Sequence, residues 1–495
     1  MKTAYIKALA AIMIGAGLTG CGDKFLATDI PNGVETEEAL NSVQNLGYAL
    51  NGTYYAFYYY TFAGTESVIF GDLASDLPFW NAKSQHHQSI YQFSPTDTDL
   101  IFKDMWDYGY KTADNAARVI EGAEALRPGV TDEDELGELN RCEAEAYALR
   151  GYAQLMLTNI FAHQIKVNGS DFSATPGIVV INKPVKPYQP VKRSTVGESY
   201  AAIVSDFKKS LECFDAAGYD AGSLFYLSPK AVYGLLARTY LYMENYAEAA
   251  QAAQKALDLA GISALTYTPE EYRALYNGGN SNVESMFALA IDNSNNWSAN
   301  SMGSMWSTYG YSPNPWLQSI MADDDVRRAV WGWTRDSTPD VPIFSSGKFG
   351  AFGIGGNPAL ATNYMVNAPE MFLIKAEAAL KQHDLAGAQS ALLVVAKRNP
   401  AYASESDLPQ SEDELMAFLK DERARELFQE GLRLYDLRRW GQPVNVYATQ
   451  APEIEWMVKD YNISDAVFPI PADEINAGFG VTQNDGWKKT FPGVK

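Results

Sequence analysis

The sequence predicts a mostly α-helical protein, in which tetratricopeptide-like helix pairs form a repeat scaffold that is interrupted by a long loop-rich insertion. Two segments, 228–260 and 369–398, share one spacing of small and apolar residues around a short turn. Long stretches before them repeat apolar residues at helical intervals. Residues 261–368 break the pattern and are rich in Gly, Asn and Ser. About four helix pairs are expected, because three or more stacked repeats are needed to bury a continuous core.

The N-terminal half of the scaffold is predicted to contain long helices joined by irregular segments. A loop region is expected from Ala63 to Asp99, and an extended crossing segment at 163–193, where Pro184, Pro187 and Pro190 exclude a helix. The predicted helices have apolar residues at helical spacing and cover 37–60, 98–126, 132–162 and 195–216.

The two repeat segments carry small residues where two helices must approach closely. These are Ala237, Ala249, Ala253 and Ala256 in the first segment, and Ala376, Ala379 and Ala388 in the second. The insertion between the segments is where function is expected, since long loops on a rigid scaffold commonly carry binding residues. It is predicted to hold short strands, one of them around 283–291. A last helix is expected from Ser411 to about Trp440.

The first 21 residues have the pattern of a bacterial lipoprotein signal. Lys2 and Lys7 flank the start of an apolar run that is too short to span a bilayer, and Leu18-Thr19-Gly20 leads into Cys21. We expect residues 1–20 to be removed, Cys21 to receive a diacylglycerol, and residues 21–36 to form a tether. The alternative is an ordinary signal peptide with a chance cysteine.

Charge and cysteine content exclude several classes of protein. The net charge is −21, and loss of Lys2 and Lys7 lowers it to −23. Such a surface repels phosphates, so a nucleic-acid binder is not expected. After Cys21 only Cys142 and Cys213 remain, which is too few cysteines for a fold held together by several disulfides. Both are expected as small buried residues on helices, with a single disulfide between them as the alternative.

Two C-terminal motifs give the chain a family resemblance. Residues 422–441 read ERARELFQEGLRLYDLRRWG, and residues 468–475 read FPIPADEI, followed by Thr482-Gln483-Asn484. The chain resembles the SusD-like (RagB/SusD) outer-membrane nutrient-binding lipoproteins of Bacteroidota, whose signature is ERxxEL, EG and then DLxRWG. The resemblance covers the whole mature chain. It implies one SusD-like domain over 37–495, with the insertion at about 261–368 and the signature region at about 411–487.

The resemblance also implies a function. Such proteins capture nutrient oligomers, usually glycans, at the cell surface, and cover a SusC-like TonB-dependent transporter that performs the import. They are not enzymes. The expected location is therefore the outer membrane, with the lipid on Cys21 as anchor and the body facing the cell exterior. The expected partners are an oligosaccharide or polysaccharide and the transporter.

The signature motif itself is interpreted as structural. Three pairs of opposite charge stand three residues apart, so that each can meet on one helix face. Gly431 permits a close approach of backbone. The alternative is a direct ligand role for Arg423 or Trp440. The predicted pairs are Glu422–Arg425, Glu430–Arg433 and Asp436–Arg439.

Aromatic residues in polar surroundings are the candidate ligand contacts, because sugars offer apolar C–H faces to flat rings and hydroxyls to amides. Trp80 and Asn81 follow Asp76 in the predicted loop. A second group lies in the insertion among Ser, Asn and Gly: Trp297, Trp306, Tyr309 and Tyr311. In each case the alternative is core packing. Trp331 and Trp333 alternate as in a strand, so that one could face the core and the other solvent, and Trp333, with Trp331 as the alternative, is a further candidate ligand contact.

No cofactor or metal is expected. His86 and His87 are adjacent, and adjacent side chains rarely point the same way, so a zinc site is not predicted. Asp323-Asp324-Asp325 suggests calcium, but an EF-hand loop is incomplete here, and a charge cluster with Arg327 and Arg328 is the favoured interpretation.

Three other functions stay open at this stage. A relative that binds oligopeptides would use the same aromatic rings. A lipid-anchored glycoside hydrolase would release products, and it is not excluded because carboxylates are plentiful. A pure scaffold would show no glycan retention that depends on Trp80, Trp297 or Trp306.

Overall fold

The computed structural model describes residues 40–335, 342–449, 456–484 and 486–493. The predicted signal segment 1–20, the lipidation residue Cys21 and the tether 21–36 lie outside these residues. Within the described part of the chain, no helix combines the length and apolar character that crossing a bilayer requires.

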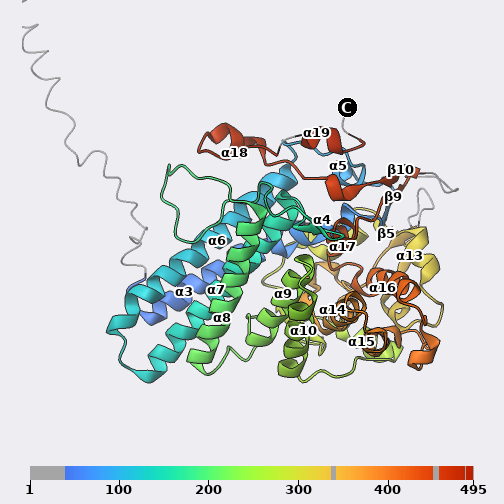
Figure 1. Cartoon of the computed structure of the whole chain (residues 1–495), viewed down its shortest axis with the longest axis horizontal. Coiled ribbons are helices and arrows are strands. Elements are labelled where there is room, and N and C mark those ends of the chain that lie inside the picture. The colour runs from blue at the N-terminus through green and yellow to red at the C-terminus, as the bar shows by residue number, and fades with distance from the viewer. Residues whose placement is uncertain (1–39, 336–341, 450–455, 485, 494–495) are drawn as a thin grey trace, which may run out of the picture.

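Four long helices form the N-terminal part of the scaffold and confirm the four predicted ones: α3 (Val43–Tyr58), α6 (Leu100–Leu126), α7 (Glu133–Phe161) and α8 (Val196–Ala217). They lie side by side at one end of the molecule, with α7 packed on both α6 and α8 (Figure 1). Ser42, Asp132 and Thr195 accept hydrogen bonds from the first turns of α3, α7 and α8, which fixes where these helices begin.

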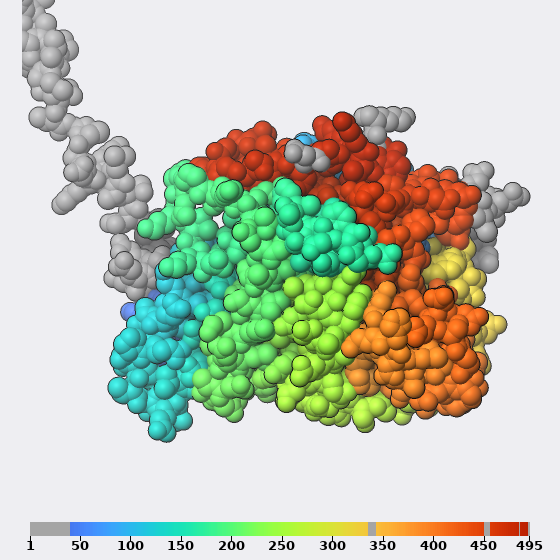
Figure 2. All heavy atoms as spheres, viewed as in Figure 1, coloured from blue at the N-terminus to red at the C-terminus, as the bar shows by residue number. Residues whose placement is uncertain are grey.

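Both predicted repeats are helix pairs: α9 (Pro229–Tyr242) with α10 (Tyr246–Ala260), and α14 (Ala368–Lys381) with α15 (Leu385–Ala396). Their turns contain Glu244 and His383 in left-handed backbone, with φ of 56° and 60°. Because α10 packs on α14, the two repeats are neighbours in space although the insertion separates them in sequence. Figure 2 shows the successive pairs as adjacent blocks across one face. The mostly helical, repeat-built fold is confirmed.

In its described residues, the insertion contains three short α-helices: α11 (Pro269–Leu275), α12 (Met302–Ser307) and α13 (Pro315–Ile320). Its strands form antiparallel pairs: β4 (Ser285–Leu289) with β8 (Asn363–Asn367), β5 (Tyr311–Pro313) with β1 (Pro78–Trp80), and β6 (Trp333–Arg335) with β7 (Pro342–Phe344). The strand predicted around 283–291 is confirmed by β4.

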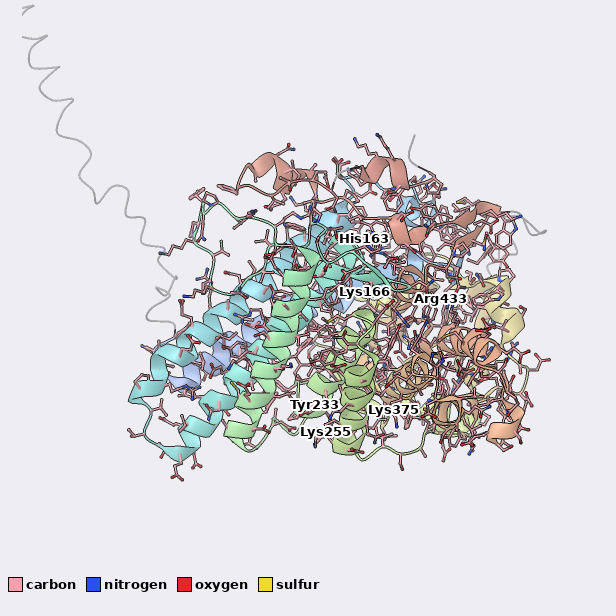
Figure 3. The ribbon with its side chains drawn as sticks, in the orientation of Figure 1. His163, Lys166, Tyr233, Lys255, Lys375 and Arg433 are labelled. Atoms are coloured by element: carbon pink, nitrogen blue, oxygen red, sulfur yellow. The ribbon has the colours of Figure 1, made fainter. Side chains whose placement is uncertain are left out.

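Residues 163–193, all of them described, contain no helix, as predicted from their prolines. They begin with the hairpin β2 (Lys166–Val167) and β3 (Ser170–Asp171), which packs on α17 (Arg433–Trp440). His163, Lys166 and Arg433 mark this region in Figure 3. The C-terminal part adds β9 (Val444–Tyr447), β10 (Trp456–Tyr461), α18 (Ala472–Ala477) and α19 (Trp487–Thr490).

The predicted loop region from Ala63 to Asp99 is wrong in part, because it holds two helices, α4 (Glu66–Leu73) and α5 (Gln88–Tyr91). Every residue of α4 is buried. A helix that is enclosed on all sides has no polar face, so the 3.6-residue alternation that would reveal it is missing.

The single helix predicted from Ser411 to Trp440 is also wrong. It is divided into α16 (Glu412–Leu427) and α17, with Gln429 and Gly431 between them at φ of 70° and 72°. The expected close approach at Gly431 is confirmed, since a Cβ there would lie 2.0 Å from the carbonyl oxygen of Val68 on α4. The break lets α17 turn into the centre of the molecule.

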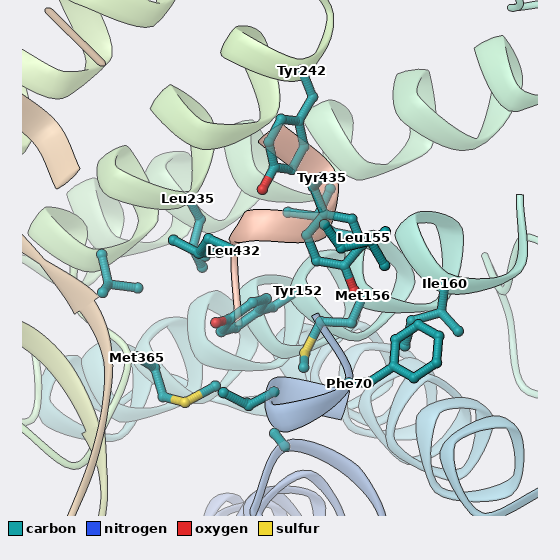
Figure 4. Close-up of a cluster of buried hydrophobic side chains, with 14 of the residues drawn as sticks. Phe70, Tyr152, Leu155, Met156, Ile160, Leu235, Tyr242, Met365, Leu432 and Tyr435 are labelled. Carbon is teal, nitrogen blue, oxygen red and sulfur yellow. The ribbon is translucent and has the colours of Figure 1, made fainter. Parts of the chain in front are cut away.

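Around this contact, α4, α7, α9 and α17 bury a common cluster of apolar side chains (Figure 4). Phe70 from α4, Tyr152 from α7, Tyr242 from α9 and Tyr435 from α17 all belong to it. The signature helix is therefore a core element.

The ion pairs of the signature match two of the three predicted ones. Arg425 contacts Glu422 and Arg439 contacts Asp436, at 2.7 and 2.8 Å. The predicted pair Glu430–Arg433 is wrong, because the helix break separates the two residues. Glu430 pairs with Lys348, and Arg433 pairs with Asp76. Arg423 and Trp440 are both buried, which supports the structural interpretation.

Candidate functional site

Five tyrosines fall within residues 54–60, where α3 ends and a short π-helical turn (Tyr60–Gly64) begins. Two of them are tied inward, since the Tyr54 hydroxyl donates to Glu145 at 2.6 Å and the Tyr58 hydroxyl donates to the Asn295 carbonyl at 2.9 Å. Tyr55 is 54% exposed, and Tyr59 and Tyr60 are half-buried. The helix end therefore presents aromatic rings at the surface.

Trp297 of the insertion packs among these tyrosines. Its ring centroid lies 4.7 Å from that of Tyr59, 4.9 Å from Tyr58 and 5.7 Å from Tyr60. Its indole N–H donates to the Tyr58 carbonyl at 3.3 Å, and the half-buried ring fills the space over Gly64. A tryptophan with its N–H engaged and part of its face open can serve as a rigid plate.

Tyr108 of α6 extends the arrangement by stacking on Tyr59, with ring centroids 4.3 Å apart and planes at 7°. Burial, and then neighbouring carboxylates or tyrosines, raise the pKa of Tyr60 and of Tyr108, so both hydroxyls stay protonated as hydrogen-bond donors at neutral pH. We call this group the aromatic patch: Tyr55, Tyr58, Tyr59, Tyr60, Tyr108 and Trp297.

The loop that carries Trp297 is ordered by its own side chains. Asp292 accepts hydrogen bonds from the backbone N–H groups of Ser294 and Asn295, at 2.7 and 2.8 Å. The hydrogen bond from the Ser294 hydroxyl, and then these two backbone bonds, lower the pKa of Asp292 and keep it ionised. Trp297 is thus held on a fixed turn, which favours binding because less order has to be gained.

A hollow of about 500 Å³ lies beside the aromatic patch, lined by residues of α4, α5, α6 and the segment before α5. Asp104, one turn before Tyr108 on α6, lines it together with Glu66, His86 and His87. Burial, and then the charges of Glu66 and Asp107, raise the pKa of Asp104 to about 6. Asp104 links the two features, because it lines the hollow and lies one helical turn from Tyr108 of the patch.

The structure brings the two predicted groups of site residues together, because β1 pairs with β5 and places Trp80 opposite Tyr311. Asn81 continues the contact by donating from its backbone N–H to the Gly310 carbonyl at 3.0 Å. Tyr309 stacks on His86 at 4.2 Å and is half-buried, at the rim of the hollow. Asn81 and Tyr309 are both half-buried, so each side chain is still partly accessible.

The expected exposure of Trp80, Trp306 and Tyr311 is wrong, since they are 3%, 1% and 0% exposed. The polar residues around them form turns and strand ends, while the rings point inward. Trp80 packs on Tyr91 at 5.7 Å and Trp306 packs on Phe428 at 4.8 Å. None of the three offers a plate to a ligand.

The structure also places the two tryptophans at 331 and 333, the three aspartates at 323–325 and the two cysteines. Trp333 is 41% exposed and Trp331 is half-buried, as the alternation predicted. Asp325 is buried against Arg327 at 2.7 Å, which supports the charge-cluster interpretation of the three aspartates. Cys142 and Cys213 are free thiols on α7 and α8.

The tyrosine run at 54–60 is the part of this face that the sequence interpretation missed, since it treated the segment only as the end of a helix. A signal was present. Five tyrosines in seven residues cannot all turn to one helix face, so some had to be exposed.

Comparisons with known proteins agree with the fold. A SusD-like family model, described as starch-binding and associating with the outer membrane, matches residues 24–241, and a model of the SusD family matches residues 369–487. No curated protein sequence matches the chain.

Solved structures also resemble the chain. A SusD superfamily protein from Bacteroides thetaiotaomicron has a TM-score of 0.77 at 23% identity, covering 90% of this chain and 99% of that one. A SusD-like carbohydrate binding protein from Bacteroides vulgatus has a TM-score of 0.70 at 20% identity, covering 83% and 86%. At these identities the likeness establishes the fold.

Proposed function

The chain belongs to the SusD-like family, and from this premise we propose that it captures nutrient glycans at the outer membrane on the aromatic patch around Trp297. The description of the matching family model supports a carbohydrate ligand and an association with the outer membrane. The single observation that carries the site assignment is the clustering of the accessible tyrosines Tyr55, Tyr59 and Tyr60 around Trp297.

The patch suits a sugar polymer physically. The C–H faces of successive sugar rings can stack on Tyr55, Tyr59 and Trp297, each stack contributing on the order of 1 kcal/mol. Hydroxyls of the polymer can meet the Tyr60 hydroxyl and the polar groups that line the hollow. Several weak contacts spread over an open face give capture that is still reversible, as transfer to an importer requires.

The remaining parts of the proposal follow from the family resemblance. The lipid on Cys21 anchors the protein, its body faces the cell exterior, and a SusC-like TonB-dependent transporter receives the glycan. The protein binds its ligand and does not cleave it.

The test is retention of the purified full chain by soluble polysaccharides in affinity gels, followed by calorimetry with the best ligand. Trp297→Ala and Tyr59→Ala should each weaken binding about fivefold or more, since about 1 kcal/mol per ring corresponds to that factor. Trp456→Ala and Tyr188→Ala are matched controls, because these rings are 39% and 85% exposed outside the patch. Equal loss in the controls, or none in the patch variants, would refute the site assignment.

The competing functions give different results in the same assays. An oligopeptide binder would retain peptides and ignore the polysaccharide panel, yet lose that retention in Trp297→Ala. A glycoside hydrolase would release reducing ends during incubation. A scaffold protein would retain none of the glycans, with or without the patch.

A further inference from the structure

Glu66, His86 and His87 meet in the hollow beside the aromatic patch. One ligand atom from each lies within 4.8 Å of the other two. Adjacent side chains ordinarily diverge, which is why the sequence alone predicts no shared site. His87 is an exception because its backbone is left-handed, with φ 56° and ψ 22°, and its ring centroid lies 4.2 Å from that of His86.

Three polar atoms in this group are hidden from solvent and make no well-aligned hydrogen bond, although two of them, His87 Nε2 and Glu66 Oε2, lie 3.1 Å apart. They are Nε2 of His86, Nε2 of His87 and Oε2 of Glu66. Buried polar atoms nearly always have a hydrogen-bond partner, so even a single one that lacks a partner needs an explanation. These unsatisfied atoms belong to the same three residues whose ligand atoms lie within 4.8 Å of one another, which calls for a group between them.

Among the described residues, the Glu66 carboxylate forms no ion pair with a guanidinium or ammonium group. Glu66 is 5% exposed, and among the described residues its ion-pair contact is with His87 alone, Nε2 to Oε2 at 3.1 Å. Several other buried carboxylates of the chain face guanidinium groups, as Glu377 faces Arg439 and Glu370 faces Arg238. A buried carboxylate without such a partner is unfavourable unless a cation sits beside it.

We propose that Glu66, His86 and His87 bind one divalent transition-metal ion of the zinc class. Two imidazole nitrogens and a carboxylate oxygen are a donor set that such ions accept, at about 2.0–2.2 Å from the metal. Ligand atoms of a tetrahedral ion at those lengths stand about 3.4 Å apart. The 3.1 Å between His87 Nε2 and Glu66 Oε2 is already close to that spacing.

The proposed ion joins two separate elements. Glu66 belongs to the first turn of the buried helix α4, and the two histidines belong to the segment that leads into α5. Tyr309 covers the ring of His86 from the insertion side. Three protein ligands leave a fourth position for water or for an oxygen of a bound molecule, and the hollow is the space on that side. The inference is independent of the proposed glycan function.

The test uses the full chain, stripped with a chelator and then titrated with Zn²⁺ by calorimetry and with Co²⁺ by visible absorption. We expect one ion per chain, a rise in melting temperature on binding, and Co²⁺ bands without thiolate charge transfer. His87→Gln and Glu66→Gln should weaken binding by more than about 100-fold, because even changes behind a ligand cost about 10–100-fold. His383→Gln is the matched control, since His383 pairs with Glu412 at 2.9 Å but is exposed.

Each result bears on the proposal. Loss of the ion in His87→Gln and Glu66→Gln, with wild-type stoichiometry in His383→Gln, supports it. Binding that survives both changes, or that shows a thiolate band, places the ion elsewhere and overturns it, as does absence of binding in the wild type. If one variant fails to fold, the other and the metal-dependent melting shift of the wild type still decide.

Discussion

Arg433 and Asp76 form a bidentate ion pair across 357 positions of sequence, with Nε to Oδ1 at 2.7 Å and Nη2 to Oδ2 at 2.9 Å. The Arg433 guanidinium is buried on α17, and Asp76 lies in the short segment between α4 and β1. The pair therefore ties the signature helix to the strand β1, which carries Trp80 to the edge of the candidate site. The C-terminal core thus helps to hold β1 and its partner β5 in place.

Removing one partner of this pair should be costly. Asp76→Ala leaves the Arg433 charge buried without its carboxylate, and a change of this kind costs about 3–5 kcal/mol of unfolding free energy. Urea denaturation measures it. The control is Glu212→Gln, which breaks the exposed pair Lys209–Glu212 on α8 and should leave the free energy nearly unchanged. Equal effects of the two substitutions would contradict the structural importance of the Arg433 pair.

Gly431→Ala should be among the most destabilising single methyl additions in the chain. The new Cβ would meet the Val68 carbonyl at 2.0 Å, and φ of 72° adds backbone strain. We expect a loss of roughly 3 kcal/mol or more. Gly52→Ala is the matched control, because Gly52 lies within α3 with nothing near its Cβ position. That change should raise stability by about 0.5–1 kcal/mol, and the two denaturation midpoints should move in opposite directions.

The helical scaffold could be predicted from sequence because its signal is local. Apolar spacing located α6, α7 and both repeat pairs, and prolines located the extended segment 163–193. The signal failed where burial is complete on all sides, as in α4, since no polar face marks the period. It also failed at the break between α16 and α17, where helix-forming residues stand on both sides of Gly431.

Exposure of the site residues was predictable only in part, for a different reason. Trp80 and Trp297 stand in similar polar surroundings in the sequence, yet one is buried and the other lies in the aromatic patch. The difference depends on a long-range partner, since β5 covers Trp80 through the pairing with β1. The convergence of His86 and His87 likewise depends on one backbone angle, and no residue type in the sequence dictates it.

Acid should weaken the signature core through Glu377. Burial alone would raise its pKa, but the charge and hydrogen bonds of Arg439 outweigh burial and lower the pKa from 4.5 to about 2. The ionised form therefore stabilises the fold fully above pH 4.5, and this contribution is lost as the pH falls toward 2. A shift of that size corresponds to roughly 3 kcal/mol.

The variant Glu377→Gln isolates this contribution. It should be less stable than the wild type at pH 7, and the difference should shrink by roughly 3 kcal/mol toward pH 2. Denaturation curves at several pH values between 7 and 2.5 measure it. A difference that stays constant across this range would show that the Glu377 carboxylate does not titrate as described.

Two tryptophans of the insertion should respond in opposite ways to truncation, since burial and ligand contact are separate properties. Trp306 is 1% exposed and packs on Phe428, so Trp306→Ala should cost about 3–5 kcal/mol of stability. Its affinity for the best polysaccharide should be unchanged under conditions where it stays folded. Trp297→Ala removes a half-buried ring and should cost less stability, while lowering affinity. Denaturation and calorimetry on the same two samples make the comparison. If Trp306→Ala also lost affinity in its folded state, the binding face would have to extend beneath α12, and the aromatic patch would be only its border.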